Sequence, residues 1–224
     1  MDKLKLKCFY YHLTVSLIVV ISVSLTCQFI WFPSPFLKLD GTWRALLTLA
    51  CIDIIIGPLL TLLLVSSKKS SRENIFDLGI ILIIQISALS YGLLQISQER
   101  IYALIYLNGA FNPVPIKEIT VKDQTKVLSL PKYNGIYYGT SVNSLPDNIN
   151  ANPLLFSPEN YQPITSEIIG KNKFLYDNLP LNVRKTYGAE YIFKVLPGKQ
   201  GVAVIILDQK LSIKDIVLLD RRIQ

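Results

Sequence analysis

The sequence predicts a membrane protein in which a three-helix bundle, running up, down and up, precedes a small α+β domain with a mostly antiparallel sheet. Three stretches with almost no charge support the bundle. Residues 8–37 and 78–98 contain no Lys, Arg, Asp or Glu, and residues 45–67 contain only Asp53. Because about 20 apolar residues are enough for a helix to cross a bilayer, each stretch is long enough to do so.

The overall composition argues against several other classes of protein. Of the 224 residues, 50% are hydrophobic and 17% are charged, whereas soluble domains carry about 25% charged residues. This deficit argues against a soluble enzyme and against a disordered chain. The three cysteines all lie in or beside the apolar stretches, so a disulfide-rich secreted module is also excluded.

We expect the first helix over about residues 11–32, the second over 43–66 and the third over 75–98. Residues 1–98 would then form the transmembrane domain, and residues 99–224 would form the second domain. The apolar part of the first helix is longer than that of a cleaved signal peptide, so we expect this helix to remain in the protein. The connections between the helices are too short to hold a further domain.

The distribution of basic residues predicts the orientation in the membrane. The formal net charge is +7, and the basic residues cluster before the first helix and between the second and third: Lys3, Lys5, Lys7, Lys68, Lys69 and Arg72. Under the positive-inside rule, the N-terminus lies in the cytoplasm and the second domain lies outside. The basic charge therefore indicates topology and weak attraction to anionic membrane lipid, and not binding to nucleic acid.

The second domain has the residue pattern of a small sheet. Runs rich in β-branched and aromatic residues predict strands, and turn residues separate them. The predicted strands cover 101–107, 111–119, 190–196, 202–207 and 213–219. Residues 131–185 are rich in Pro, Asn and Tyr and show little periodicity, so we expect loops there, with one or two short helices near 158–179. The many tyrosines of this domain indicate either a protein-binding surface or a half-buried core, and both interpretations stay open.

Asp53 is the residue of the bundle that most needs an explanation, because a carboxylate deep in a bilayer costs about 2.5–3.5 kcal/mol on insertion scales. Small and polar residues recur at helical spacing on both later helices: Ala50, Asp53, Gly57 and Thr61 on the second, and Gln85, Ala88 and Gly92 on the third. Such stripes allow close packing and hydrogen bonds between helices. The depths of these residues predict the hydrogen-bonded pairs Asp53–Tyr91 and Thr61–Gln85.

Two functions are open to Asp53: a proton relay or ion site, or a contact that holds the bundle together or docks a partner. A relay needs further acidic or histidine groups nearby. The expected start of the first helix places His12 at the cytoplasmic edge, roughly 20 Å from the level of Asp53, and we therefore favour packing or docking. We also expect Gly57-Pro58 to kink the second helix and to free a backbone carbonyl near Ile54, since proline has no N–H.

The sequence offers no arrangement typical of catalysis. It contains no P-loop, no GxGxxG and no GxSxG motif, and His12 is the only histidine. Residues 99–224 contain neither His nor Cys, so a nucleophile activated by histidine cannot be built there. We therefore expect no catalytic residues, no metal site and no cofactor.

Several short motifs occur in an order that resembles one known family, the type IV pilin accessory proteins (the TfpX/TfpZ family). They are Trp31-Phe32-Pro33, Asp40-Gly41, Asp53, Gly57-Pro58-Leu59-Leu60-Thr61-Leu62, Lys68-Lys69-Ser70, Asp77-Leu78, Gln85, Ala88-Leu89 and Tyr91-Gly92. The resemblance covers about residues 28–100, and it is looser in the second domain. The chain departs from the family pattern at Phe32, where Tyr is common, at Thr42, where Gly is common, and at Ile101, where Pro often follows Arg100.

This resemblance implies a protein of the inner membrane of a Gram-negative bacterium, with a periplasmic second domain and type IV pilin as its partner. It implies a chaperone or assembly factor that binds pilin, and not an enzyme. Pilins carry an acidic residue within their membrane helix, and the polar stripe through Asp53 and Thr61 would shelter it. The candidate partner-binding residues are Trp31, Asp40, Asp53, Gly57, Pro58, Thr61, Gln85, Tyr91 and Gly92.

One alternative of another class stays open from the sequence. A small membrane sensor or transport subunit would use the second domain to bind a ligand and the helices to signal or conduct. The short cytoplasmic connections argue against a signalling role, and three helices are few for a transport path.

Overall fold

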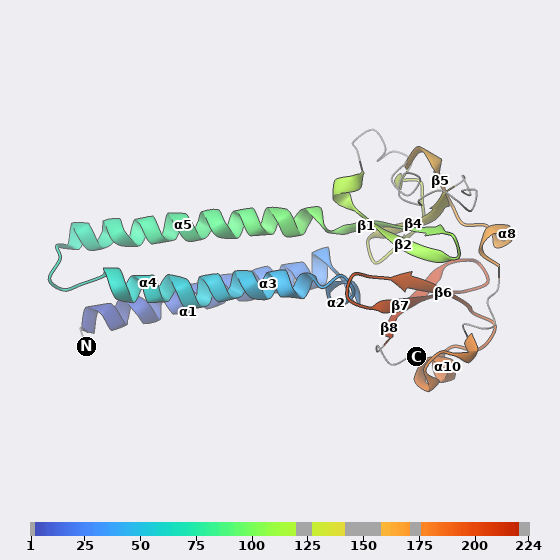
Figure 1. The fold of residues 1–224 in the computed structure, drawn as a ribbon, viewed down its shortest axis with the longest axis horizontal. Coiled ribbons are helices and arrows are strands. Elements are labelled where there is room, and N and C mark those ends of the chain that lie inside the picture. Colours follow the sequence, from blue (N-terminus) through green and yellow to red (C-terminus); the bar gives the residue numbers. More distant parts are fainter. Residues whose placement is uncertain (1–2, 120–126, 142–157, 171–175, 220–224) are drawn as a thin grey trace. The chain divides into compact units, whose positions relative to one another are not determined.

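The computed structural model describes residues 3–119, 127–141, 158–170 and 176–219. The chain divides into two compact units. Unit 1 comprises Met1–Trp31 and Thr42–Ser97, and unit 2 comprises Phe32–Gly41 and Gln98–Gln224. Figure 1 shows that unit 1 consists of long helices and that unit 2 contains the sheet.

Unit 1 contains three helices that are each long and apolar enough to cross a membrane. This confirms the prediction made from the uncharged stretches. Short π-helical segments, labelled η1 and η2, interrupt or end two of the helices. The elements are α1 (Lys3–Thr26) with η1 (Cys27–Trp31), then α3 (Thr42–Cys51), η2 (Ile52–Ile56) and α4 (Gly57–Leu64), and finally α5 (Ser71–Gln98).

The first helix begins at Lys3, and the prediction that it begins near residue 11 is wrong. The polar start of α1 does not stop the helix, because lysine is a good helix former whose long side chain can reach toward water. The earlier start has a consequence for His12, which now lies in the third turn of a helix that packs against α4 and η2. His12 is therefore not at the edge of the bundle.

The connection between α4 and α5 is built from specific hydrogen bonds. Asn74 accepts the N–H of Ser66 through Oδ1 at 3.0 Å and donates through Nδ2 to the carbonyl of Ser66 at 2.8 Å. Ser70 and Glu73 form a reciprocal capping box, in which each side chain accepts the backbone N–H of the other residue. The capping box satisfies two backbone N–H groups at the start of α5, those of Ser70 and Glu73.

Unit 2 contains one sheet with the strand order β3-β4-β1-β2-β6-β7-β8, and β5 pairs with β4. Most pairings between the described strands are antiparallel, but β4 with β1 and β2 with β6 are parallel. The strands are β1 (Ile101–Leu107), β2 (Ala110–Pro115), β3 (Lys132–Tyr133), β4 (Ile136–Ser141), β5 (Tyr161–Gln162), β6 (Ile192–Pro197), β7 (Val202–Leu207) and β8 (Ile213–Leu219). All five predicted runs contain a strand.

The assignment of residues 131–185 to loops and short helices misses β3, β4 and β5. Every residue of β4 is buried, so this strand lacks the polar and apolar alternation by which half-buried strands are recognised. Gly139 within it lies so close to β5 that a Cβ atom there would overlap the carbonyl oxygen of Gln162. The short α-helices of unit 2 are α2 (Phe36–Leu39), α8 (Ser166–Ile169) and α10 (Leu181–Thr186), and its short 3-10 helices are η3 (Ile116–Glu118) and η4 (Pro158–Asn160).

The tyrosines of unit 2 contribute mainly to its core. Tyr137, Tyr138 and Tyr161 are each exposed by 5% or less. Tyr176 and Tyr187 are partly buried. They pack on a hydrophobic cluster formed by Leu179, Val183, Phe193, Val204 and Ile206. These positions therefore support the interpretation as core and not the interpretation as a tyrosine-rich binding surface.

The segment 32–41, which separates the first and second long helices in the sequence, belongs to unit 2. Phe32, Phe36 and Leu39 are almost fully buried. The N–H of Gln200, in the turn between β6 and β7, donates to the carbonyl of Leu39 at 2.9 Å. Segment 32–41 is therefore more than a connection between two helices, because its apolar side chains pack into unit 2.

Asp40 lies in this segment, near two charged residues of unit 2. Burial raises the pKa of Asp40 to about 6; Glu99 adds to the rise and Lys199 opposes it. The carboxylate of Glu99 is itself paired with Lys117 at 2.5 Å and with Lys199 at 2.9 Å. The neutral form of Asp40 is therefore favoured in the folded unit at acidic pH.

Gly198 provides a test of the packing of segment 32–41. A Cβ atom at Gly198 would overlap the side chain and the carbonyl oxygen of Leu39, whereas a Cβ at Gly201 would reach Leu218 only at 3.7 Å. We expect Gly198→Ala to destabilise unit 2 by about 1–3 kcal/mol, the usual cost of overpacking, and Gly201→Ala to have little effect. Thermal unfolding of the purified protein in detergent measures both. Equal melting temperatures for the two variants would contradict the packing described here.

The raised pKa of Asp40 predicts a pH dependence of stability. The folded state binds this proton more tightly than the unfolded state, so the contribution is greatest below about pH 4 and is lost as the pH rises to about 6. A rise of two pKa units corresponds to at most about 3 kcal/mol. Asp40→Asn cannot ionise, so its stability relative to the wild type should rise between pH 4 and pH 7. Parallel profiles of melting temperature against pH would refute the assignment.

Candidate functional site

Four polar residues from three helices meet inside unit 1, and we call them the polar cluster: His12, Asp53, Thr61 and Gln85. Nδ1 of His12 lies 2.6 Å from Oγ1 of Thr61. Nε2 of His12 lies 2.7 Å from Oε1 of Gln85. His12 of α1 therefore links α4 to α5. This is the arrangement by which polar side chains join helices in an apolar solvent.

The direct pair predicted between Thr61 and Gln85 is therefore wrong in detail. The two residues lie at matching depth, but the imidazole ring of His12 stands between them and bonds to both. The error follows from the predicted start of the first helix. The prediction begins this helix eight residues later than the structure does and therefore places His12 at its end. The available signal was that the only histidine of the chain lies within a stretch that has no charged residue.

The backbone near Asp53 explains the position of Gln85. The N–H of Gly57 donates to the carbonyl of Ile52, which is the π-helical pattern of η2. Pro58 has no N–H, so neither residue 57 nor residue 58 provides the helical donor that the carbonyl of Asp53 would otherwise use. Nε2 of Gln85 donates to this carbonyl at 3.5 Å. The freed carbonyl is thus that of Asp53, next to Ile54, where the prediction placed it.

Two glycines allow side chains of α5 and of the helices α3 and α4 to approach closely. A Cβ atom at Gly57 would overlap the side-chain amide of Gln85, and a Cβ at Gly92 would overlap the side chain of Leu49. Gly57, Pro58 and Thr61 are all buried. The small-residue stripes predicted on the second and third helices therefore face neighbouring helices.

The hydrogen bonds restrict the protonation of His12. Oε1 of Gln85 can only accept, so Nε2 of His12 carries a proton. The Thr61 hydroxyl has one proton and lies 3.2 Å from the carbonyl of Gly57 as well as 2.6 Å from Nδ1 of His12. A ring with its proton on Nε2 accepts at Nδ1, so the Thr61 hydroxyl can donate to it.

Asp53 itself is only 5% exposed, and its Oδ2 atom has no hydrogen-bond partner among the residues that the structure describes. The predicted partner Tyr91 is 67% exposed, so the pair Asp53–Tyr91 is wrong. Asp53 instead lines a cavity of about 90 Å³ together with His12, Ser16 and Gln85. The other walls of this cavity are aliphatic.

The remaining predicted site residues do not join the polar cluster. Trp31 ends η1 and is partly buried. Asp40 belongs to unit 2. Of the nine candidates, five therefore come together: Asp53, Gly57, Pro58, Thr61 and Gln85. His12 joins them, although the sequence predicted it at the cytoplasmic edge of the bundle.

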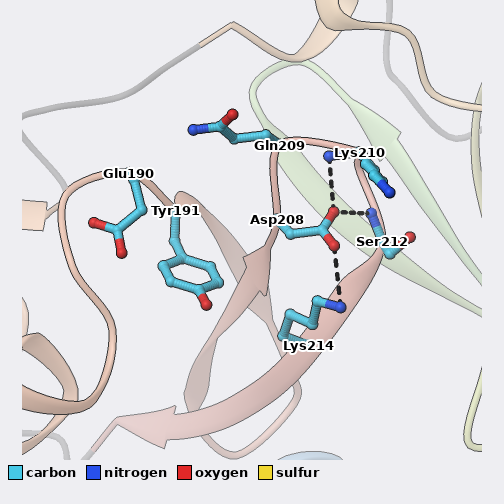
Figure 2. Close-up of a pocket in the computed structure, with 7 residues that line it drawn as sticks. All are labelled: Glu190, Tyr191, Asp208, Gln209, Lys210, Ser212 and Lys214. Carbon is cyan, nitrogen blue, oxygen red and sulfur yellow. Dashed lines mark hydrogen bonds and ion pairs between the residues drawn. The ribbon is translucent and has the colours of Figure 1, made fainter.

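Unit 2 has a surface hollow of about 430 Å³ beside the turn between β7 and β8 (Figure 2). Oδ1 of Asp208 accepts the N–H groups of Lys210 and Ser212, both at 2.9 Å, and Oδ2 pairs with Lys214 at 3.1 Å. These contacts, led by the bond from Ser212, hold the pKa of Asp208 below its ordinary value. The carboxylate is thus occupied in stabilising its own turn. Within the described residues, no group of three His, Cys, Asp or Glu side chains could hold a metal ion.

Removing His12 tests the importance of the polar cluster. We expect His12→Leu to destabilise unit 1 by about 1–3 kcal/mol, because interhelical hydrogen bonds in membranes contribute about 0.6–2 kcal/mol each and two are lost. Tyr10→Leu is the matched control, since Tyr10 is on the same helix and is 60% exposed. The measurement is the thermal unfolding of the two variants in detergent. A melting temperature of His12→Leu equal to that of the control would contradict the role given to His12.

Comparison with known proteins identifies relatives that share one description. A fimbrial assembly protein of serogroup E1 from Dichelobacter nodosus is 33% identical over 95 residues, which is 42% of this chain and 37% of the relative. The fimbrial assembly protein of serogroups C1 and C2 is 34% identical over 95 residues, again 42% of this chain, but 72% of the relative. The corresponding protein of serogroup I is 34% identical over 37% of its length.

The match thus spans little more than a third of two of these relatives and almost three quarters of the third. No family model matches the chain, and no solved structure matches it significantly. The identity to the protein of serogroups C1 and C2, over most of that relative, is sufficient to assign the family. This chain belongs to the family of fimbrial assembly proteins.

Proposed function

We propose that this chain is an inner-membrane accessory protein for type IV pilin, of the TfpX/TfpZ kind, and that it acts by binding pilin during fimbrial assembly. The observation that carries the proposal is the similarity to fimbrial assembly proteins, in a chain with three helices able to cross a membrane. A pilin subunit with an apolar helix and a globular head would meet a partner that offers both helices and a folded unit.

The proposed orientation places the N-terminus in the cytoplasm and unit 2 in the periplasm. The basic residues near the start of α1 and between α4 and α5 support it, since these positions favour the cytoplasmic side. Segment 32–41 joins α1 to α3 and belongs to unit 2. In this orientation it would reach the periplasm together with residues 98–224, as one folded unit.

We propose that the protein acts by binding and does not catalyse a reaction. The hydrogen bonds of His12, Thr61 and Gln85 run between helices of the same unit. Such bonds give a bundle a fixed shape that a partner can recognise. Residues 99–224, which contain the whole sheet, have no His and no Cys, which is compatible with a binding surface and argues against the common nucleophilic mechanisms.

Deletion of the gene, followed by complementation with the full chain, tests this function. We expect the deletion to lower the level of pilin or the number of surface pili, because unassembled pilin would lack its binding partner, and we expect complementation to restore both. Immunoblots of membranes and electron microscopy of cells measure the two quantities. Unchanged pilin and unchanged pili in the deletion strain would refute the proposed role.

A further inference from the structure

A long groove lies between α1 and α5 in unit 1, and we call it the α1–α5 groove. Its volume is about 590 Å³. Lys7 and His12 lie in its lining, and the other lining side chains are those of Leu4, Cys8, Tyr11, Val15, Leu78 and Leu82, most of them apolar. Two of these side chains are also substantially exposed, Tyr11 at 75% and Leu82 at 53%. The groove is therefore an accessible apolar surface along two helices of the kind that cross membranes.

The α1–α5 groove adjoins the small cavity beside Asp53. The two spaces share three lining residues, His12, Val15 and Leu82. The space between α1 and α5 thus begins near the first turns of α1 and ends at the polar cluster. A ligand that fills the groove would bring one end close to the Asp53 carboxyl group.

One oxygen of the Asp53 carboxyl group, Oδ2, lacks a hydrogen-bond donor among the described residues. Asp53 is only 5% exposed. The other members of the polar cluster do not supply this donor, because His12 bonds to Thr61 and Gln85, and the Gln85 amide donates to the backbone of Asp53. A buried acceptor without a donor is costly, so a donor supplied from outside would bind favourably.

We propose that the α1–α5 groove receives one apolar transmembrane helix of a partner, and that a side chain of this helix donates a hydrogen bond to Oδ2 of Asp53. This inference rests on the proposed function, in which the partner is pilin. The donor is a hydroxyl, a protonated amine or a neutral carboxyl group. A carboxyl group of the partner binds only in its protonated form, since two carboxylates side by side repel each other.

Two features together select a helix over the other occupants of such a space. A lipid acyl chain would fill the apolar groove, but it has no donor to offer Asp53. A water molecule would donate to Asp53, but it would leave the apolar walls unfilled. A helix with one polar side chain satisfies both, because it covers Leu78, Leu82 and Val15 with apolar side chains and places its donor at the inner end.

The native cysteines provide the test. Cys8 lines the groove, whereas Cys51 is exposed on α3 and lines neither the groove nor the cavity. One variant keeps only Cys8 (Cys27→Ala, Cys51→Ala), and its control keeps only Cys51 (Cys8→Ala, Cys27→Ala). Each is expressed in cells with pilin that carries single cysteines along its membrane helix, and a short bismaleimide joins nearby thiols.

We expect the Cys8 variant to give adducts with pilin positions on one face of its helix, at a yield at least about tenfold above that of the Cys51 variant, the ratio for a preference of 1.4 kcal/mol. In the Cys8 variant, the further change Asp53→Leu should lower the yield severalfold, and Asp53→Asn, which keeps an acceptor oxygen, should lower it less. Immunoblots of the same membranes check that all variants accumulate to equal levels.

Each contrary result overturns a defined part of the inference. Equal adduct yields from Cys8 and Cys51, or no pilin adduct at Cys8, would remove the groove as the docking site. Undiminished adducts in Asp53→Leu would remove the hydrogen bond to Asp53. If deletion of the gene still reduces pili while Cys8 gives no adduct, the assembly role stands and only the groove assignment falls.

Discussion

The packing of unit 1 depends on how one proline is accommodated in an apolar environment. Pro58 offers no N–H, and the π-helical turn before it directs the N–H of Gly57 to Ile52, so the carbonyl of Asp53 needs an external donor. Lipid cannot supply one, and the Gln85 amide does. This contact requires that residue 57 be glycine, because any larger side chain would occupy the place of the amide. The Gln85 amide in turn presents its oxygen to His12.

Segment 32–41 gives unit 2 three covalent connections to the helices of unit 1 in place of one. The chain enters and leaves unit 2 at this segment and enters it again after α5. The apolar side chains of the segment are buried, and its backbone is fixed to the turn between β6 and β7.

Patterns that depend on local sequence predicted much of this structure. Uncharged stretches identified the three long helices, and runs such as 101–107 and 202–207 identified strands. The positions of Asp53, Gly57, Thr61 and Gln85 on two facing stripes followed from helical spacing. What failed depended on tertiary packing: β4 is buried on both faces and shows no alternation, and His12 was misplaced because the start of α1 was set by apolar residues alone, although lysines extend the helix.

The backbone of Asp53 takes part in the packing of the bundle, whereas its Oδ2 atom is available to a partner. The hydrogen bonds that join the helices use the side chains of His12, Thr61 and Gln85 and the backbone of Asp53. Oδ2 of Asp53 takes no part in them within the described structure. An apolar residue at position 53 would keep the backbone carbonyl and would avoid the cost of a buried acceptor. Packing alone therefore does not account for an aspartate at this position, whereas a ligand that donates to its free oxygen does.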